Sequence, residues 1–343
     1  MNIVVLCGGI STEREISITS GYRVCEGLRS YGHNAVMMDV YFGNESLDIL
    51  ENAKEEYDLE KEKAIIEGYT EILEEEMKNR SLFFGKNVIA ICQKADIVFM
   101  ALHGKCGEDG LCQAAFDLNG IKYTGSGHLA SAIGMDKGVT KQMFKAYGVP
   151  TPESMWIRKS DQMNYDELNL KYPVVVKACN GGSSVGVIIA QNREEFDDAI
   201  QTCFELDDEV LIEKYVKGRE FSVGVVSGKA LPIVEIIPKN GWYDYKNKYQ
   251  AGATEDICPA PLSKELTEKM QKIAEDACDS IGVVAYARAD VLMDDEENMY
   301  CLEVNTLPGM TPTSLVPMEA KAIGFDFPEL CNMLVELSLE KYQ

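Results

Sequence analysis

Three oxygen-bearing side chains near the C-terminal end of the chain have the types and spacing of a divalent-metal site. Asp290 lies in one stretch of alternating apolar and polar residues, 288–293, and Glu303 and Asn305 lie in a second, 300–305. Every second side chain of a β-strand points to the same face, so two adjacent strands would bring the three together. Magnesium held by one or two carboxylates usually completes its octahedron with water and nucleotide phosphate oxygens. The pattern favours a magnesium site that binds ATP, although a solvated acidic strand face has the same alternation.

A lysine and a glycine-rich loop in the middle of the chain indicate where phosphate would bind. Lys177 ends an apolar run that predicts a strand, and the loop 178–186 leads into a second predicted strand, 187–189. A buried ammonium is costly unless it meets an anion, so we expect Lys177 to contact a phosphate. Small residues let backbone N–H groups approach phosphate oxygens closely, while a plain hairpin turn is the alternative for this loop.

The composition restricts the partners and the compartment. The chain has 343 residues and a formal net charge of -23, which disfavours nucleic acids and anionic membrane surfaces. An anionic substrate therefore requires a local cluster of cations. No stretch approaches the roughly 20 apolar residues of a membrane span, and the N-terminus predicts a strand rather than a signal peptide. The 11 cysteines are scattered without a Cys-x-x-Cys pair, which favours a reducing, cytoplasmic compartment and argues against structural zinc.

The N-terminal part of the chain predicts an α/β domain. Apolar runs predict strands at 3–6, 35–40 and 95–102, and a helical pattern follows the first of them to residue 28. Ligands of open α/β sheets gather beyond the carboxyl ends of the strands, so the loop that begins at His103 is a candidate for the site. The acidic segment 44–87 predicts one or two surface helices without a role in chemistry.

The rest of the chain predicts the walls of a binding site. We expect helices at 194–206 and 263–281, and a polar hinge between two strands within 210–223 whose Glu220 would accept hydrogen bonds from ribose hydroxyls. The aromatic, basic and glycine-flanked stretch 241–252 has the composition of a loop that closes over a site, although a surface loop with exposed tyrosines is equally compatible.

Short motifs follow one another along almost the whole chain. In chain order they are Gly8-Gly9-x-Ser11-x-Glu13-Arg14-Glu15-x-Ser17, Ala101-Leu102-His103-Gly104 with Gly107-Glu108-Asp109-Gly110, Tyr123-Thr124-Gly125-Ser126-Gly127, Met135-Asp136-Lys137, Gly182-Ser183-Ser184-Val185-Gly186, Tyr243-Asp244-Tyr245 with Lys248-Tyr249, and Glu303-x-Asn305-Thr306-x-Pro308-Gly309-Met310-Thr311 with Ser314-Leu315-Val316-Pro317. This ordered set closely resembles the D-alanine-D-alanine ligases of the ATP-grasp superfamily. The chain departs from the usual pattern at 178–181, where Ala-Cys-Asn-Gly replaces a charged, proline-containing start of the glycine-rich loop.

The resemblance implies an α/β fold with three-domain ATP-grasp architecture. An N-terminal parallel α/β domain would cover residues 1–124, a central domain 125–213, and a C-terminal domain with the metal site 214–343. ATP would lie between the central and C-terminal domains.

The resemblance also implies roles for individual residues. Glu13 would anchor the ammonium of the first D-alanine and connect through Ser183 to Tyr249, with His103 beside the same substrate. Arg288 and the Gly309 amide would face the reacting carboxyl group, and Ser314 and Leu315 would receive the carboxylate of the second D-alanine. The implied nucleotide contacts are Lys137, Lys177, Glu213, Lys214, Val216, Glu220 and Lys248. The implied metal ligands are Asp290, Glu303 and Asn305.

The implied reaction is the ATP-dependent ligation of two D-alanines through an acyl phosphate, for peptidoglycan precursor synthesis. A carboxylate is a poor electrophile, so its conversion to an acyl phosphate needs cations around the transferred phosphoryl group. The implied cofactor is Mg²⁺ or Mn²⁺, with two ions expected. The implied partners are D-alanine, ATP and a second copy of the chain in a homodimer, with neither nucleic acid nor membrane.

Three alternatives remain open on the sequence. A sister ligase could use D-serine or D-lactate as its second substrate; Tyr249 argues against D-lactate, whereas an apolar pocket rejects an added hydroxyl only about 10²-fold. The stretch 125–130 loosely fits a dinucleotide fingerprint, which would suggest a dehydrogenase, but the acidic ribose contact about 20 residues later is missing. A non-catalytic nucleotide-binding relative would not need the full set of metal and cationic residues.

Overall fold

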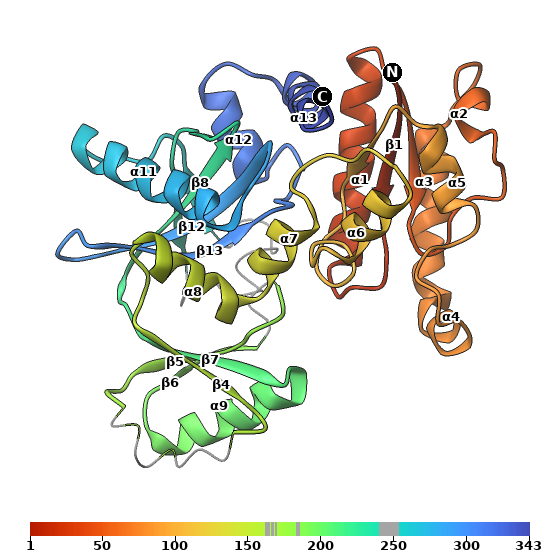
Figure 1. Ribbon diagram of the computed structural model, residues 1–343. Helices are drawn as coiled ribbons and strands as arrows, with labels where there is room; N and C mark the ends of the chain where they lie inside the picture. Colours follow the sequence, from red (N-terminus) through yellow and green to blue (C-terminus); the bar gives the residue numbers. More distant parts are fainter. Residues whose placement is uncertain (162–164, 166–167, 169, 183–185, 240–253) are drawn as a thin grey trace.

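The computed structural model describes residues 1–161, 165, 168, 170–182, 186–239 and 254–343 of the chain. The strands of this part form three sheets. Figure 1 shows the sheet of the N-terminal residues on the right, a middle sheet at the bottom and a C-terminal sheet at the upper left. The predicted loop 241–252 lies outside the described residues.

The N-terminal sheet is parallel, with strand order β2-β1-β3. Its elements are β1 (Asn2–Cys7), α1 (Arg14–Ser30), β2 (Asn34–Asp39), α5 (Val88–Lys94), β3 (Ile97–Met100) and α6 (Leu111–Leu118). Beyond its first residue each of β1 and β2 is buried throughout, as is all of β3, which suits apolar strands covered on both faces. The predicted α/β unit is confirmed, although β3 is shorter than the predicted strand.

The acidic segment between β2 and α5 folds into short helices on the surface; they are three α-helices and a 3₁₀ helix, more than the one or two predicted. They are α2 (Ile49–Asn52), α3 (Leu59–Gly68), the 3₁₀ helix η1 (Tyr69–Ile72) and α4 (Leu73–Asn79). One residue of α3, Ile66, is 1% exposed and packs in the N-terminal core. Arg14 donates hydrogen bonds to the Ile66 carbonyl (3.1 Å) and to Thr70 Oγ1 (3.1 Å). The segment therefore holds the start of α1 in place.

The middle sheet is antiparallel, with strand order β4-β7-β5-β6, and helix α9 covers one of its faces. The elements are α7 (His128–Met135), α8 (Lys137–Tyr147), β4 (Ser154–Arg158), β5 (Val174–Ala178), β6 (Val187–Ala190), α9 (Arg193–Leu206) and β7 (Glu209–Lys214). Val174 and Val176 pack against Phe196 of α9, so the alternating residues Val175 and Lys177 point to the opposite face.

The C-terminal sheet has strand order β11-β10-β8-β12-β13, with β9 paired to β8. The elements are β8 (Gly218–Val226), β9 (Lys229–Ala230), β10 (Val234–Pro238), β11 (Thr254–Ile257), α11 (Lys264–Ile281), β12 (Tyr286–Asp294) and β13 (Met299–Asn305). Ala287 and Ala289 pack with Met270 of α11, so Arg288 and Asp290 point to the face away from that helix.

Two last helices, α12 (Leu315–Ala322) and α13 (Phe327–Glu340), follow the C-terminal sheet. Helix α13 returns to the N-terminal part of the molecule and packs against α1, as Figure 1 shows. Leu330 and Leu334 of α13 belong to the same core as Ile3 and Val5 of β1. The N-terminal sheet is therefore completed by the last helix of the chain.

Capping side chains fix where three of the longer helices begin. Asn192, Ser263 and Asp326 each accept a hydrogen bond from a backbone N–H in the first turn of α9, α11 and α13. The predicted helices 194–206 and 263–281 are confirmed to within a residue. In the described parts of the chain, no helix has both the length and the apolar character needed to cross a bilayer.

Candidate active site

A cavity of about 600 Å³ lies between the inner faces of the middle and C-terminal sheets. Apolar side chains from both sheets, among them Ile189 and Leu292, line part of it, and such an apolar slot suits a planar ring. The strand, polar linker and strand predicted within 210–223 are confirmed as β7, residues 215–217 and β8, and the linker forms one edge of the cavity. All the described residues expected to contact nucleotide line the cavity: Lys137, Lys177, Glu213, Lys214, Val216 and Glu220.

The three predicted metal ligands gather at the inner face of the C-terminal sheet. Asp290 is the register partner of Glu303 across β12 and β13, and Asn305 Nδ2 lies 3.2 Å from Asp290 Oδ2. Asp290 and Glu303 line the cavity, while Asn305 lines a smaller recess of about 30 Å³ beside it. The strand alternation was sufficient to predict this grouping, because the two strands are adjacent and antiparallel.

Arg288 already binds one of these carboxylates. Its guanidinium makes a two-pronged contact with Asp290, with Nε 2.8 Å from Oδ1 and Nη2 2.9 Å from Oδ2. A cation that binds Asp290 has to compete with this guanidinium. Arg288 also influences the pKa values of His103 and Glu108, which places its charge near both.

Two lysines share a buried glutamate at the floor of the cavity. Glu213 Oε1 lies 2.6 Å from Lys141 Nζ, and Glu213 Oε2 makes an ion pair with Lys177. Burial by itself raises the pKa of Glu213, but the two ammonium groups outweigh it and lower the pKa to about 2. Burial lowers the pKa of Lys141, whereas Glu213 overcomes the effect of burial at Lys177 and raises its pKa. Lys177 was expected to contact a phosphate; its anionic partner in the described structure is Glu213, and the phosphate contact stays a prediction.

A second group of side chains lies at the carboxyl end of β3. Glu13 is 8% exposed and lies against the glycine-rich loop, since a Cβ atom on Gly182 would come within 2.7 Å of Glu13 Oε2. His103 is also 8% exposed, its Nε2 lies 3.4 Å from Ser20 Oγ, and burial lowers its pKa. Burial and the charge of Glu13 raise the pKa of Glu108 to about 8, and its Oε2 accepts a hydrogen bond from the Gly104 amide (2.9 Å). The recess that Glu108 and Asn305 line connects this group with the metal-ligand group.

The loop after β13 brings Gly309 and Ser314 together. A Cβ atom on Gly309 would lie 3.0 Å from Ser314 Oγ, which accepts a hydrogen bond from the Thr311 amide (3.1 Å). The Leu315 side chain is 7% exposed and packs against Val234 and Ile236, so it is the backbone at Leu315 that remains for a ligand. Three further predicted residues, Ser183, Lys248 and Tyr249, lie outside the described residues.

Two residues of this region had no role assigned from the sequence. Lys141 follows Lys137 by one helical turn and precedes the buried Phe144, so a lysine on the apolar face of a helix was the available signal. Glu108 lies in the loop after a buried strand. The sequence pattern included it in a motif but gave it no role of its own. Glu213, the partner of Lys141, and Glu13, whose charge acts on Glu108, are both distant in sequence, and periodicity does not identify such neighbours.

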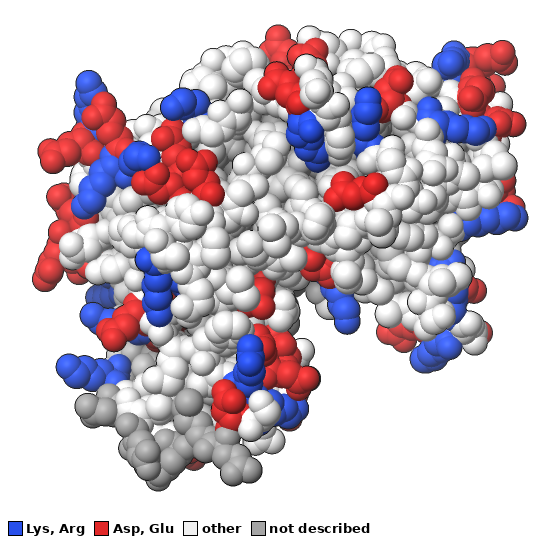
Figure 2. All heavy atoms as spheres, in the orientation of Figure 1, with Lys and Arg blue, Asp and Glu red and all other residues white. Residues whose placement is uncertain are grey.

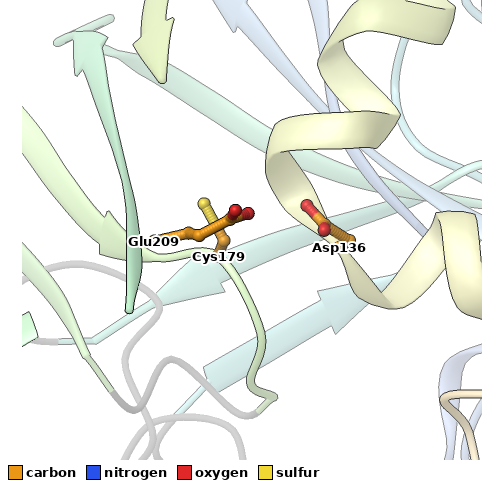
Figure 3. A group of neighbouring side chains, drawn as sticks. All are labelled: Asp136, Cys179 and Glu209. Atoms are coloured by element: carbon orange, nitrogen blue, oxygen red, sulfur yellow. The ribbon is translucent and has the colours of Figure 1, made fainter. Parts of the chain in front are cut away.

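Asp136, Cys179 and Glu209 form a cluster that could at first sight hold a metal (Figure 3). Asp136 caps α8 by accepting from the Val139 amide, and Glu209 accepts hydrogen bonds from Trp156 Nε1 (3.2 Å) and Arg158 Nε (2.9 Å). Burial raises the pKa of the Cys179 thiol to about 12, so it keeps its proton at neutral pH. We therefore interpret the cluster as a joint between α8 and the middle sheet.

The negative net charge is spread over the molecule. Figure 2 shows acidic and basic side chains intermixed on one face, separated by wide areas without ionisable groups. The cations that face the cavity are instead local, with Lys137, Lys177, Lys214, Lys217 and Arg219 among its lining residues. Five acidic side chains also line the cavity, so its lining is balanced in charge while the whole chain carries a net charge of -23. The anionic substrate of such a site would be met by these lysines and by the bound metal.

Comparisons with known proteins agree with this geometry. The profile described as D-ala D-ala ligase N-terminus matches residues 2–126, and that described as D-ala D-ala ligase C-terminus matches residues 143–336. The chain is 40% identical to the D-alanine--D-alanine ligase of Pediococcus pentosaceus over 98% of this chain and 97% of that protein. It is 41% identical to the enzyme of the same name from Lacticaseibacillus casei over 100% of this chain and 97% of that protein.

Solved structures of similar proteins have the same fold. The D-alanine--D-alanine ligase from Bacillus anthracis superposes with a TM-score of 0.77 at 34% identity, covering 99% of this chain and 98% of that one. The crystal structure of the B. anthracis enzyme complexed with ATP gives a TM-score of 0.75 at 32% identity, with the same coverage. The expected ATP-grasp fold is thus confirmed, and the chain belongs to the D-alanine-D-alanine ligase family.

Proposed function

We propose that this protein joins two molecules of D-alanine into D-alanyl-D-alanine, converting ATP to ADP and phosphate, and so supplies peptidoglycan precursor synthesis. The observation that carries the proposal is the convergence of two groups on one cavity, the acidic row of β12 and β13 and the buried lysine-glutamate cluster. Glu108, which is close enough to Glu13 for its pKa to be raised by that charge, lines the adjoining recess. A dehydrogenase requires none of these groups, and the relatives support the ligase over that alternative.

ATP would occupy the cavity between the middle and C-terminal sheets. Its base would lie in the apolar slot near the β7–β8 linker, with Glu213, Lys214 and Val216 along one edge and Glu220 at the ribose. Lys137 and Lys177 would neutralise the phosphates, together with Lys248 from outside the described residues. The B. anthracis relative, whose structure is complexed with ATP, supports this assignment.

The inner face of the C-terminal sheet fits Mg²⁺ or Mn²⁺, with two ions expected. Asp290, Glu303 and Asn305 would hold them, since all three offer hard oxygen atoms, and Asp290 is both opposite Glu303 and within 3.2 Å of Asn305. When bound, the metal would offset the negative charge of the transferring phosphoryl group. Arg288, released from Asp290, would then be available to the oxygens of the reacting carboxyl group.

The first D-alanine would lie beside Glu13 and His103. Glu13 would bind its ammonium, and Ser183 and Tyr249 would complete that contact. After phosphorylation of its carboxylate, the neutral amine of the second D-alanine would attack the acyl phosphate, and phosphate would leave. Arg288 and the Gly309 amide would stabilise the tetrahedral oxyanion, a contribution worth on the order of 10² to 10³ in turnover for one donor. Ser314 and the backbone of Leu315 would bind the carboxylate of the second D-alanine.

The molecular organisation is proposed on the same basis. The three domains would be 1–124, 125–213 and 214–343, which fits a separate sheet in each. A cytoplasmic location fits the eleven free cysteines. The homodimer follows from the family resemblance, and light scattering of the purified protein tests it.

The purified protein tests the reaction directly. With ATP, Mg²⁺ and D-alanine it should release phosphate and form the dipeptide. The same assay with D-serine or D-lactate as the second substrate tests the sister ligases, and faster dipeptide or depsipeptide formation with either would replace the D-alanine assignment.

Two substitutions test the metal assignment. Glu303→Gln and Asp290→Asn should each lower magnesium-dependent turnover by on the order of 10² or more, because each removes a carboxylate that would hold the metal beside the phosphates. Both proteins should keep the wild-type circular dichroism spectrum, and Glu296→Gln, at the exposed turn between the same strands, is the matched control. Wild-type turnover in both variants would show that the metal is bound elsewhere.

A further inference from the structure

Lys141 lies behind the wall of the cavity rather than in it. Its side chain is 1% exposed, compared with 12% for Lys177. Lys177 and Glu213 are among the described residues that line the cavity, and Lys141 is not. Helix α8, which carries Lys141, packs against both β7 and α11 and lies between the middle and C-terminal sheets in Figure 1. Any effect of Lys141 on a nucleotide would therefore be exerted through another side chain.

The ammonium of Lys141 has three oxygen partners. It lies 2.6 Å from Glu213 Oε1, donates to Thr151 Oγ1, and lies 3.5 Å from the carbonyl oxygen of Cys301. Two of these contacts are hydrogen bonds, to Thr151 and Cys301, and the contact with Glu213 is a short ion pair. Because the partners come from β7, β13 and the segment before β4, the contact fixes Glu213 relative to both sheets.

The charges of the cluster do not balance. Glu213 carries one negative charge and its two neighbours, Lys141 and Lys177, carry two positive charges. A phosphate that enters the cavity competes with Glu213 for the ammonium of Lys177. If Lys177 were the only partner, its movement toward the phosphate would leave a buried carboxylate uncompensated beside an anionic ligand, which is strongly unfavourable.

We propose that Lys141 is a positioning residue for nucleotide binding: it keeps Glu213 neutralised and in place, so that Lys177 can turn to phosphate. This inference rests on the proposed binding of ATP in the cavity. It assigns Lys141 no contact with ATP, metal or D-alanine. It also explains why a lysine is buried at a point where an apolar residue would fill the space at lower cost.

The inference predicts a selective loss of ATP affinity. Lys141→Met removes the charge and keeps the length of the side chain. We expect the dissociation constant and the KM for ATP to rise about 10- to 100-fold, the equivalent of one hydrogen bond to a charged group. In Lys141→Met, the KM for D-alanine and the kcat at saturating ATP should change by less than about threefold. Lys141→Arg keeps the charge, so its ATP affinity should lie within about threefold of the wild-type value. The matched control is Lys145→Met, an exposed lysine one turn further along α8.

A double-mutant cycle separates this role from a purely structural one. If Lys141 acts through Glu213, adding Lys141→Met to Glu213→Gln should change ATP affinity by less than about threefold, because no carboxylate remains to be neutralised. The comparison of Glu213→Gln with the double variant does not need the Lys141→Met single variant to fold. A tenfold loss on adding Lys141→Met to Glu213→Gln would overturn the inference.

The thermal shift produced by ATP provides an independent readout. A purely structural Lys141 would lower the melting temperature equally with and without ATP, so an unchanged ATP-induced shift in Lys141→Met would also overturn the inference. Binding of Mg-ATP to the wild-type protein tests the proposed function separately. If it fails to bind Mg-ATP, the function is wrong; if it binds ATP and Lys141→Met binds equally well, only the role of Lys141 is wrong.

Discussion

Two buried ion clusters, one in the N-terminal sheet and one below the cavity, differ in their charge balance. In the first, Arg14 Nη2 lies 2.6 Å from Asp39 Oδ2, with the two side chains 4% and 0% exposed. Arg14 also donates to three oxygens of the surrounding chain, at Gly9, Ile66 and Thr70, while Asp39 Oδ1 accepts from the amides of Tyr41 and Phe42. This cluster is neutral, whereas the cluster at Glu213 has two lysines for one glutamate and opens onto a cavity.

This difference in charge balance indicates that the first cluster contributes to the stability of the fold and the second to ligand binding. A neutral cluster with every partner inside the protein has nothing to offer a ligand, so its energy contributes to holding the loop after β1 against α3. The cluster at Glu213 opens onto the cavity, where the charges of Glu303 and Glu220 also act on Lys177, and the Lys177 ammonium is within reach of an anionic ligand. A basic side chain paired with a carboxylate thus contributes to stability in the first cluster and to ligand binding in the second. The number of charges in each cluster distinguishes the two roles.

The largest effect is expected from opening the neutral cluster. Arg14→Met leaves Asp39 buried without a counter-charge, and we expect the free energy of unfolding to fall by about 3–5 kcal/mol in urea titrations at neutral pH. Replacing both residues, as Arg14→Met with Asp39→Asn, should recover part of that loss. A decrease below about 1 kcal/mol for Arg14→Met, the range of an exposed pair, would show that the cluster does not hold the loop.

A smaller effect, of a different kind, is expected at the cavity. Lys177→Met leaves Glu213 paired with Lys141, so the free energy of unfolding should change by only about 1 kcal/mol. The dissociation constant for ATP should rise about 10- to 100-fold, because one charged contact to phosphate is lost. Isothermal titration calorimetry measures it, with Lys171→Met, an exposed lysine before β5, as the control. A loss of stability as large as that of Arg14→Met would remove the distinction between the clusters.

The smallest effect concerns pH. The pKa of Glu213 is lowered to about 2 from its ordinary value of 4.5, so the unfolded chain binds more protons than the folded one in this range. Stability from this group is fully present above pH 4.5 and is lost as the pH falls from 4.5 toward 2. Burial raises the pKa of Asp39 in spite of Arg14, which gives the opposite slope.

The two variants Glu213→Gln and Asp39→Asn measure this contrast. Relative to wild type, Glu213→Gln should make stability less sensitive to acid below pH 4.5, and Asp39→Asn should make it more sensitive. Urea titrations at several acidic pH values provide the comparison. Parallel profiles for the two variants would show that the clusters do not differ in the way their charge count indicates.

Local pattern was enough to predict much of the fold and part of the site. The period of two in β12 and β13 grouped Asp290 with Glu303 and Asn305, because strand neighbours in sequence were also neighbours in the sheet. The apolar run before Lys177 showed that its ammonium needed an anion. That this anion is Glu213, and that Lys141 also pairs with it, depends on how α8, β5 and β7 pack, and side-chain periodicity carries no information on that packing.

The pairing of Arg14 with the segment 66–70 was missed for the same reason. The acidic surface helices looked independent of the core because their charges dominate the sequence, yet a few backbone and hydroxyl oxygens on them complete a buried guanidinium. The amino-acid composition of such a segment shows that most of it is exposed. Its contacts with the core are made by a few isolated residues, which composition does not reveal.

The return of α13 to α1 affects how the chain can fold while it is being synthesised. Leu330 and Leu334 of α13 share a core with Ile3 and Val5 of β1. The apolar surface of β1 is therefore fully covered only after α13 has been synthesised. A nascent chain that stalls before residue 327 would leave this apolar surface exposed, and such surface favours aggregation.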